Sequence, residues 1–120
     1  MAQYIDGFVL PVPKKTLQVY RRMARKAGTI WREYGALDYR ECVGDDLAVK
    51  MGVPFTRLAK LKAGETVVFS WILYTSRAHR DRVNAKVMKE PRIENMCASD
   101  AMPFDVKRMA YGGFKTFVKA

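Results

Sequence analysis

Two stretches of the chain are apolar at almost every position, namely residues 4–12 and 65–74. Unbroken apolar runs are typical of strands that are covered on both faces, in the middle of a sheet. The second run is also rich in β-branched and aromatic residues. Pro11 and Pro13 are expected to end the first strand, because proline has no N–H to donate to a ladder.

Residues 36–43 show an alternating pattern instead. One side carries Leu37, Tyr39, Glu41 and Val43, and the other side carries Asp38, Arg40 and Cys42. Alternation predicts a more exposed strand, at an edge of the sheet. Residues 107–118 predict a last strand, in which Gly112-Gly113 indicates a bulge or a close approach of backbones.

Helical spacing is found in two other stretches. Between residues 13 and 34, apolar or small side chains recur at steps of three and four: Leu17, Tyr20, Ala24, Ala27, Trp31 and Tyr34. This stripe predicts an amphipathic helix, and Gly35 stands where a C-terminal cap is expected. Residues 77–88 predict a second helix, which we expect to stop at Pro91.

The connections give weaker patterns. Residues 47–64 predict one or two short helical turns, because a structureless connection of that length is uncommon in a compact domain. Residues 93–103 are mixed and methionine-rich, and they predict a loop with a short helix.

The predicted order is β-α-β-β-α-β in a single domain spanning residues 1–120. This order indicates an α+β, ferredoxin-like fold, with an antiparallel sheet ordered 4-1-3-2 that places the two apolar strands at the centre. Two helices on one face would leave the other face bare, and such an apolar patch is normally buried. We therefore predict a homodimer through the sheet face, a dimeric α+β barrel. The pattern leaves open which face the helices cover.

The net charge of +10 is the unusual global property of the chain. It is compatible with an anionic ligand or nucleic acid, and also with a solubilising surface over which Lys and Arg are spread. We favour the surface interpretation. Nucleic-acid binding is not expected, because residues 67–71 do not match the consensus of an RNA-recognition strand.

Location and metal content follow from what the sequence lacks. No apolar run approaches the roughly 20 residues of a membrane span, and the N-terminus does not have the pattern of a signal peptide. We therefore expect a cytoplasmic protein without membrane contact. Two cysteines and one histidine do not make an ordinary zinc site, so we predict neither a metal nor a cofactor.

Several segments together resemble a known family. They include Tyr-Ile-Asp-Gly-Phe-Val at 4–9, Gly-Ala-Leu at 35–37, Glu-Cys-Val at 41–43, Val-Val-Phe-Ser-Trp at 67–71, Pro-Arg at 91–92, Met-Pro-Phe-Asp at 102–105, Lys-Arg-Met at 107–109 and Tyr-Gly-Gly-Phe at 111–114. On these residues the chain is similar to the YbaA-like family of small bacterial proteins of unknown function. The resemblance implies a dimeric α+β barrel, ferredoxin-like in each chain, and implies no reaction. Val106 stands where the family pattern leads us to expect glycine.

Asp6 and His79 are the candidate catalytic residues. Asp6 interrupts an apolar central strand, and Arg108, Lys115 or Tyr111 could reach it from the neighbouring strand. It is either a polar group that lines a ligand cavity or a structural residue, in an ion pair or in a hydrogen bond that closes the sheet, and the structural interpretation is favoured. His79 lies in the first turn of the second helix. It is either a general base over the sheet or, in the favoured interpretation, a partly buried residue that packs at the helix start.

Four further residues are candidates for ligand binding: Ser70, Asn84, Arg108 and Tyr111. Ser70 and Trp71 point to opposite faces of the third strand, so only one of them can face the bare side. Asn84 either bonds across a cavity or points to solvent. Arg108 either binds an anion or clamps an acid at the end of the sheet. Cys42 is expected to pack as a small apolar group.

These features favour a protein that binds or converts a small molecule in a cavity beside the sheet. The alternatives are a structural or interaction dimer without catalysis and, with less support, a basic nucleic-acid-binding protein. Dimeric α+β barrels include enzymes as well as binding proteins, so the resemblance leaves catalysis undecided.

Overall fold

The computed structural model describes residues 2–97 and 102–120 of the chain. The elements are β1 (Tyr4–Pro13), η1 (Lys14–Thr16), α1 (Leu17–Glu33), β2 (Asp38–Val43), α2 (Phe55–Leu58), β3 (Glu65–Tyr74), α3 (Arg77–Val87), α4 (Pro91–Cys97), η2 (Val106–Arg108) and β4 (Ala110–Lys115). The fold is α+β, with one four-stranded antiparallel sheet in the order β2-β3-β1-β4. The two apolar strands, β1 and β3, are therefore central, as the sequence predicts.

Most elements agree with the predicted ranges, and the differences have local causes. β1 continues through Pro11 to Pro13, because β4 pairs with β1 only as far as Val9 and leaves that side without a strand neighbour. Proline is tolerated at such a position. Pro91 opens α4 and does not merely end the helix before it, since proline suits a first helical turn. The last strand is shorter than predicted and ends at Lys115.

Two glycine predictions are confirmed. Gly35 has a φ of 115° directly after α1, a conformation in which a side chain would be strained. A Cβ on Gly113 would lie 2.7 Å from Cε2 of Tyr4, so glycine allows the Tyr4 ring to lie close to the backbone of β4. The connection 47–64 contains a single helical turn, α2.

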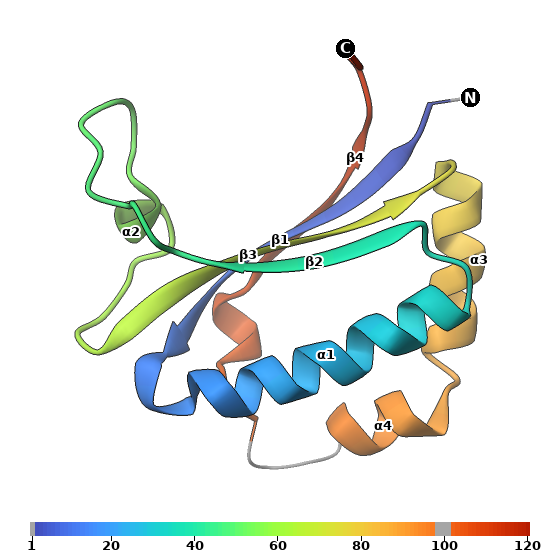
Figure 1. Ribbon diagram of the computed structural model, residues 1–120, viewed down its shortest axis with the longest axis horizontal. Coiled ribbons are helices and arrows are strands. Elements are labelled where there is room, and N and C mark those ends of the chain that lie inside the picture. Colours follow the sequence, from blue (N-terminus) through green and yellow to red (C-terminus); the bar gives the residue numbers. More distant parts are fainter. Residues whose placement is uncertain (1, 98–101) are drawn as a thin grey trace.

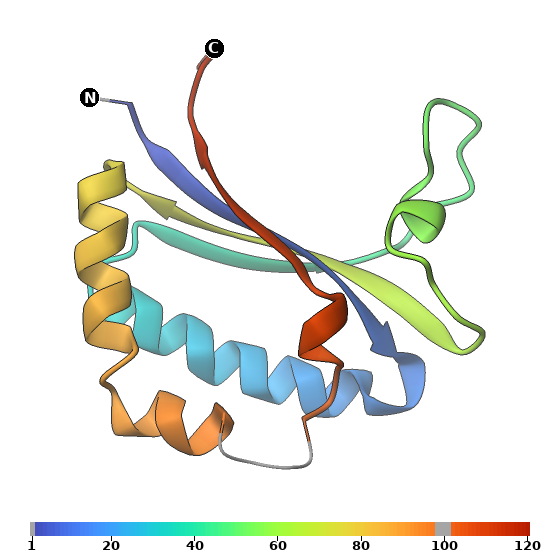
Figure 2. The same cartoon turned by 180° about the vertical axis from the view of Figure 1, so that it is seen from behind.

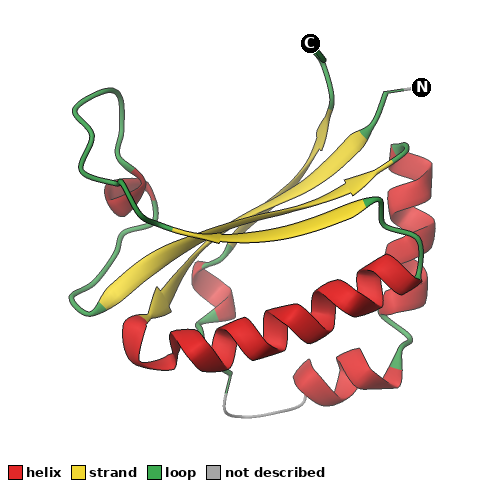
Figure 3. Cartoon of the chain, in the orientation of Figure 1, coloured by secondary structure: helices red, strands yellow, loops and turns green. Residues whose placement is uncertain are grey.

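All three longer helices lie against one face of the sheet. Figures 1 and 2 show α1, α3 and α4 on this side, whereas the segment around α2 extends on the opposite side. Figure 3 shows that this segment is mostly loop. The helix side is lined by the even-numbered residues of β1 and β3, including the buried Leu10, Val12, Val68 and Ile72. The open question of which face is covered is thereby answered.

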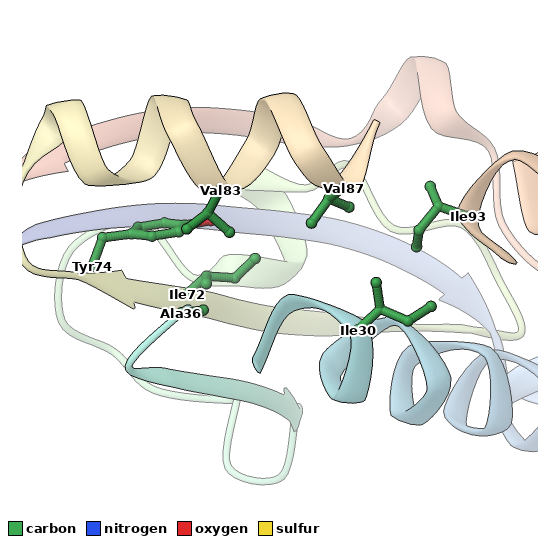
Figure 4. Close-up of a cluster of buried hydrophobic side chains, with 7 residues drawn as sticks. All are labelled: Ile30, Ala36, Ile72, Tyr74, Val83, Val87 and Ile93. Carbon is green, nitrogen blue, oxygen red and sulfur yellow. The ribbon is translucent and has the colours of Figure 1, made fainter. Parts of the chain in front are cut away.

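The core consists of two clusters between the sheet and the helices. One joins α1, α3 and α4 to the end of β3 through Ile30, Ala36, Ile72, Tyr74, Val83, Val87 and Ile93 (Figure 4). The other joins the start of α1 to the sheet through Leu10, Val12, Tyr20, Ala24 and Val68. The apolar stripe predicted for α1 faces this core. No helix within the described residues is long and apolar enough to cross a membrane.

The odd-numbered residues of the central strands form the sheet face turned away from the helices. We call it the uncovered face. It includes Ile5, Val9, Phe69, Trp71 and Leu73 of the central strands, together with Phe114 of the edge strand β4, which pairs with Ile5. Phe69 is 45% exposed although it is packed edge-on by Phe55 of α2, with ring centroids 6.5 Å apart. Cys42 lies on the same side and is exposed, so the prediction that it packs as a buried apolar group is wrong.

Candidate functional site

A cavity of about 480 Å³ lies between the sheet and the helix layer, and we call it the helix-side cavity. It is lined by five methionines, Met23, Met88, Met96, Met102 and Met109. It is also lined by six aromatic residues, Phe8, Tyr20, Trp31, Tyr39, Phe104 and Tyr111. Its size falls in the range typical of small-molecule sites. The methionine and aromatic side chains make the walls apolar. Because methionine side chains are flexible, the walls are also adaptable in shape.

Three of the predicted ligand-binding residues line this cavity: Ser70, Asn84 and Tyr111. Ser70 lies in the middle of β3 and is buried, facing the helices. Tyr111 comes from the edge strand β4, and its ring stacks on Phe8 with centroids 4.9 Å apart. The two-residue period of the strands places these side chains on the helix side.

Asn84 is the centre of a hydrogen-bond network at one end of the cavity. Its Oδ1 accepts hydrogen bonds from Trp31 Nε1, at 3.0 Å, and from the hydroxyl of Tyr74, at 3.2 Å. Its Nδ2 donates to Asp6 Oδ2 at 3.4 Å. Asn84 therefore bonds across the interior, and the alternative that it points to solvent is excluded.

Asp6 is 1% exposed and lies behind Asn84. Arg80 Nη1 donates to Asp6 Oδ1 at 2.6 Å and to the hydroxyl of Tyr111 at 3.2 Å. The charged partner of Asp6 is therefore an arginine of α3, and not Arg108 or Lys115 as expected. The cause is that α3 lies over the N-terminal part of β1, a position that strand pairing alone does not reveal. The third expected neighbour, Tyr111, does lie at this site, since it shares the Arg80 guanidinium with Asp6. Asp6 is not among the cavity-lining residues, and its geometry is that of a structural ion pair.

A second polar group on the cavity wall contains the only charged side chain among the described lining residues. Glu41 of β2 accepts a hydrogen bond from the hydroxyl of Tyr20 at Oε1 and another from the hydroxyl of Tyr39 at Oε2, both at 2.7 Å. We call Tyr20, Glu41 and Tyr39 the phenol–carboxylate trio. Burial is the largest cause, and the charge of Glu41 the second, of a raised pKa at both tyrosines. Both hydroxyls therefore stay protonated and donate their hydrogen bonds to Glu41.

The trio lies between this cavity and a groove of about 900 Å³ between α1 and β2, and both spaces are open to solvent. All three residues of the trio line both spaces, whereas Arg21, Arg25 and Arg32 line only the groove. Our candidate list did not include Glu41. Its signal in the sequence was its position on the apolar side of the alternating strand, between Tyr39 and Val43.

Comparison with known proteins identifies the family. Residues 3–106 match the model of a protein family of unknown function, DUF1428. The chain is also 42% identical over 116 residues to the uncharacterized protein YbaA of Escherichia coli K12, with 97% of each chain covered, and it has the same identity and coverage with YbaA of Shigella flexneri. The chain belongs to the DUF1428 family. The resemblance to the YbaA-like family is thereby confirmed.

Solved structures add little to this assignment. The designed protein Foldit4 covers 99% of this chain with a TM-score of 0.45 and 10% identity. A putative amidohydrolase/peptidase from Burkholderia cenocepacia has a TM-score of 0.32 and 15% identity, and the match covers 97% of this chain and 28% of that one. Similarities of this size carry no argument about function.

His79 lies apart from the cavity of this DUF1428 protein. Its Nδ1 accepts a hydrogen bond from the backbone N–H of Thr75 at 3.0 Å, and its own backbone N–H donates to the hydroxyl of Ser76, which caps α3. Its ring packs edge-on against Tyr74, with centroids 5.8 Å apart. These contacts are those of a residue that fixes the start of a helix.

Arg108 also lies apart from the cavity. Its guanidinium donates to both carboxylate oxygens of Glu65, at 2.6 and 2.9 Å, and to the backbone carbonyl of Lys60. The contacts match the interpretation in which Arg108 clamps an acid at the end of the sheet. Together with the backbone N–H of Lys62, this clamp lowers the pKa of Glu65 to about 2. Among the described residues, no group of three His, Cys, Asp or Glu side chains is arranged to hold a metal ion.

Proposed function

We propose that this protein binds a small, mostly apolar molecule in the helix-side cavity. The observation that carries the proposal is the cavity itself, about 480 Å³ of space in a region lined by methionine and aromatic side chains. Concave sites of this size, with mostly apolar walls and a few polar groups, are the usual form of small-molecule sites. The network around Asn84 supports the proposal, because it fixes one wall of the cavity.

A tryptophan provides a direct test. The chain has two tryptophans, of which Trp31 lines the cavity and Trp71 lies on the uncovered face. In a Trp71→Phe protein, Trp31 is the only tryptophan, and its emission reports on the cavity. We expect saturable quenching or a spectral shift when cyclohexylmethanol is added, since this probe is small, apolar and optically silent.

The control uses one substitution at two helical positions. Ala27 of α1 lines the cavity, and Ala27→Phe is expected to fill it and weaken the Trp31 response at least tenfold. Ala85 of α3 is exposed, and Ala85→Phe is expected to leave the response unchanged. A protein whose Trp31 does not respond, or responds equally in the Ala27→Phe variant, would contradict the proposal. Native mass spectrometry of the purified protein would add the mass of any retained ligand.

We further propose that the chain is ferredoxin-like in topology and acts as a homodimer, a dimeric α+β barrel closed through the uncovered face. The support is the apolar surface of the uncovered face, in which Phe69 of β3 is 45% and Phe114 of β4 is 62% exposed. Patches of this kind on soluble proteins mark interaction sites. A second copy is the occupant we favour, because a sheet face of this shape is complementary to another sheet face.

Light scattering after size exclusion tests the dimer. We expect twice the chain mass for the native protein and at least a tenfold weaker dimer for Phe69→Glu, since the new charge would be buried in the interface. Val19→Glu is the matched control, because Val19 of α1 is 44% exposed on the far side of the molecule. A monomeric native protein would contradict the barrel. A dimer that fails to bind the apolar probe would support a purely structural role.

A further inference from the structure

The carboxylate of Glu41 has unused capacity to accept hydrogen bonds. A carboxylate offers about four lone-pair sites, and the two tyrosine hydroxyls of the trio occupy one on each oxygen, at 2.7 Å. Both donors are neutral. Within the described residues, no Lys, Arg or His lies within ion-pair distance of Glu41. The carboxylate on the cavity wall is therefore held in place without an ion-pair partner among the described residues.

The surroundings of Glu41 also favour positive charge. The ring of Phe104 lies edge-on to Tyr20 with centroids 5.5 Å apart, and the ring of Trp31 lies 6.3 Å from that of Tyr39. Aromatic rings attract a cation that lies over one of their faces. The lining residues that the structure describes include no lysine or arginine, although the chain as a whole carries a net charge of +10. The basic side chains are thus kept outside this cavity, where an anionic ligand would meet only the carboxylate.

We propose that the ligand of the helix-side cavity is a lipophilic amine, bound with its ammonium group on Glu41 and its apolar body among the methionine and aromatic side chains. The inference rests on the proposed function, because it names the ligand class of the same cavity. The two tyrosine hydroxyls hold the carboxylate in position before the ligand arrives, which reduces the entropy lost on binding. A charge-assisted hydrogen bond between ammonium and carboxylate is stronger than a bond between neutral groups.

Three probes of the same shape separate the possibilities. They are cyclohexylmethylamine, cyclohexylmethanol and cyclohexanecarboxylate, titrated at pH 7 against the Trp31 emission of the Trp71→Phe protein. At this pH an alkyl amine is protonated, since its pKa resembles that of lysine, about 10.4. We expect the amine to bind about tenfold more tightly than the alcohol, and the carboxylate to bind most weakly.

The Glu41→Gln variant tests whether the preference comes from this side chain. The variant keeps the size of the residue and removes the charge. The affinity for the amine is therefore expected to fall to within about twofold of the affinity for the alcohol, and the affinity for the alcohol should not change. Asp45→Asn removes the same charge from an exposed turn and is expected to preserve the full preference.

The outcomes distinguish the two proposals. Equal binding of amine and alcohol to the unsubstituted cavity, or a preference for the amine that survives Glu41→Gln, would overturn the amine assignment and leave the cavity proposal standing. If none of the three probes binds to the protein with Glu41 in place, the cavity proposal itself is overturned. Loss of the preference for the amine in Glu41→Gln alone, with unchanged affinity for the alcohol, would support both.

Discussion

The guanidinium of Arg80 lies 2.6 Å from the carboxylate of Asp6 and joins α3 to the central strand β1. The side chains are 14% and 2% exposed, so both charges are largely removed from water. Arg80 also lies over the ring of Tyr4, 4.9 Å from its centroid. Such a pair is costly to break from one side, because the remaining charge stays buried without its partner.

Asp6→Asn is therefore expected to lower the free energy of unfolding by about 3 kcal/mol, the low end for breaking a buried pair, since Arg80 keeps a second carboxylate in Asp81. Asp81 is 60% exposed, and Asp81→Asn is expected to cost less than about 1 kcal/mol. Urea unfolding followed by circular dichroism measures both values. Equal losses in the two variants would mean that water screens the Asp6 pair as it screens a surface pair.

Asn84 gives a second prediction, because it accepts hydrogen bonds from two interior donors. Asn84→Ala would leave Trp31 Nε1 and the hydroxyl of Tyr74 without their acceptor. Each unsatisfied buried donor costs about 1–3 kcal/mol, so we expect a loss of about 2–4 kcal/mol despite the better helix propensity of alanine. Asn95→Ala on the exposed side of α4 should change stability by less than about 0.5 kcal/mol.

The spectrum of Trp31 gives an independent measurement on the same variant. If the network holds the indole in place, Asn84→Ala in the Trp71→Phe protein should shift the emission of Trp31 to longer wavelength as water reaches the ring. Unchanged emission together with unchanged stability would show that Asn84 does not position this wall of the cavity.

Glu65 gives a prediction about pH. The Arg108 guanidinium and the backbone N–H of Lys62 lower the pKa of Glu65 from its ordinary value of 4.5 to about 2. A carboxylate whose folded pKa is lowered contributes stability above its unfolded pKa and loses it as the pH falls through the folded value. We therefore expect the free energy of unfolding to decline between pH 4.5 and about 2.

Glu65→Gln should make that decline shallower. Part of the decline should remain, because the pKa of Glu90 is also lowered to about 2, chiefly by Arg92. Glu94→Gln, at an exposed position of α4, is the matched control and should leave the decline unchanged. Urea unfolding at a series of pH values measures it. Parallel curves for the native protein and Glu65→Gln would show that the clamp does not contribute.

The sequence was most informative where a pattern repeats along one element. Unbroken apolar runs identified β1 and β3 as central strands, and the stripe on α1 identified its buried side. Ser70, Asn84 and Tyr111 were chosen as polar groups near the expected sheet, and all three line the cavity. Periodicity is a local property, and these features depend mainly on local structure.

The features that the sequence left unpredicted depend on how separate elements are placed. Asp6 is paired by an arginine of α3, and the position of that helix over β1 is set by the packing of the whole layer. The trio depends likewise on Tyr20 of α1 reaching Glu41 of β2. A carboxylate on the apolar side of a strand was the available signal, and its meaning appears only once the helix that covers it is in place.

Gly28 of α1 gives the last prediction, which concerns the position of Tyr39. In a helix interior, alanine is normally about 1 kcal/mol more favourable than glycine. Here a Cβ on Gly28 would lie 2.7 Å from Cδ1 and 2.8 Å from Cε1 of Tyr39, and the hydroxyl of Tyr39 is held on Glu41. We therefore expect Gly28→Ala to destabilise the protein by about 1–3 kcal/mol, as overpacking does at other sites.

In a Tyr39→Leu background the ring is gone, and the same substitution should become stabilising. Urea unfolding of the four proteins in this cycle gives both values. If Gly28→Ala changes the free energy of unfolding in the same direction in both backgrounds, Tyr39 does not pack against the helix as described. The trio on which amine binding depends would then lose its support.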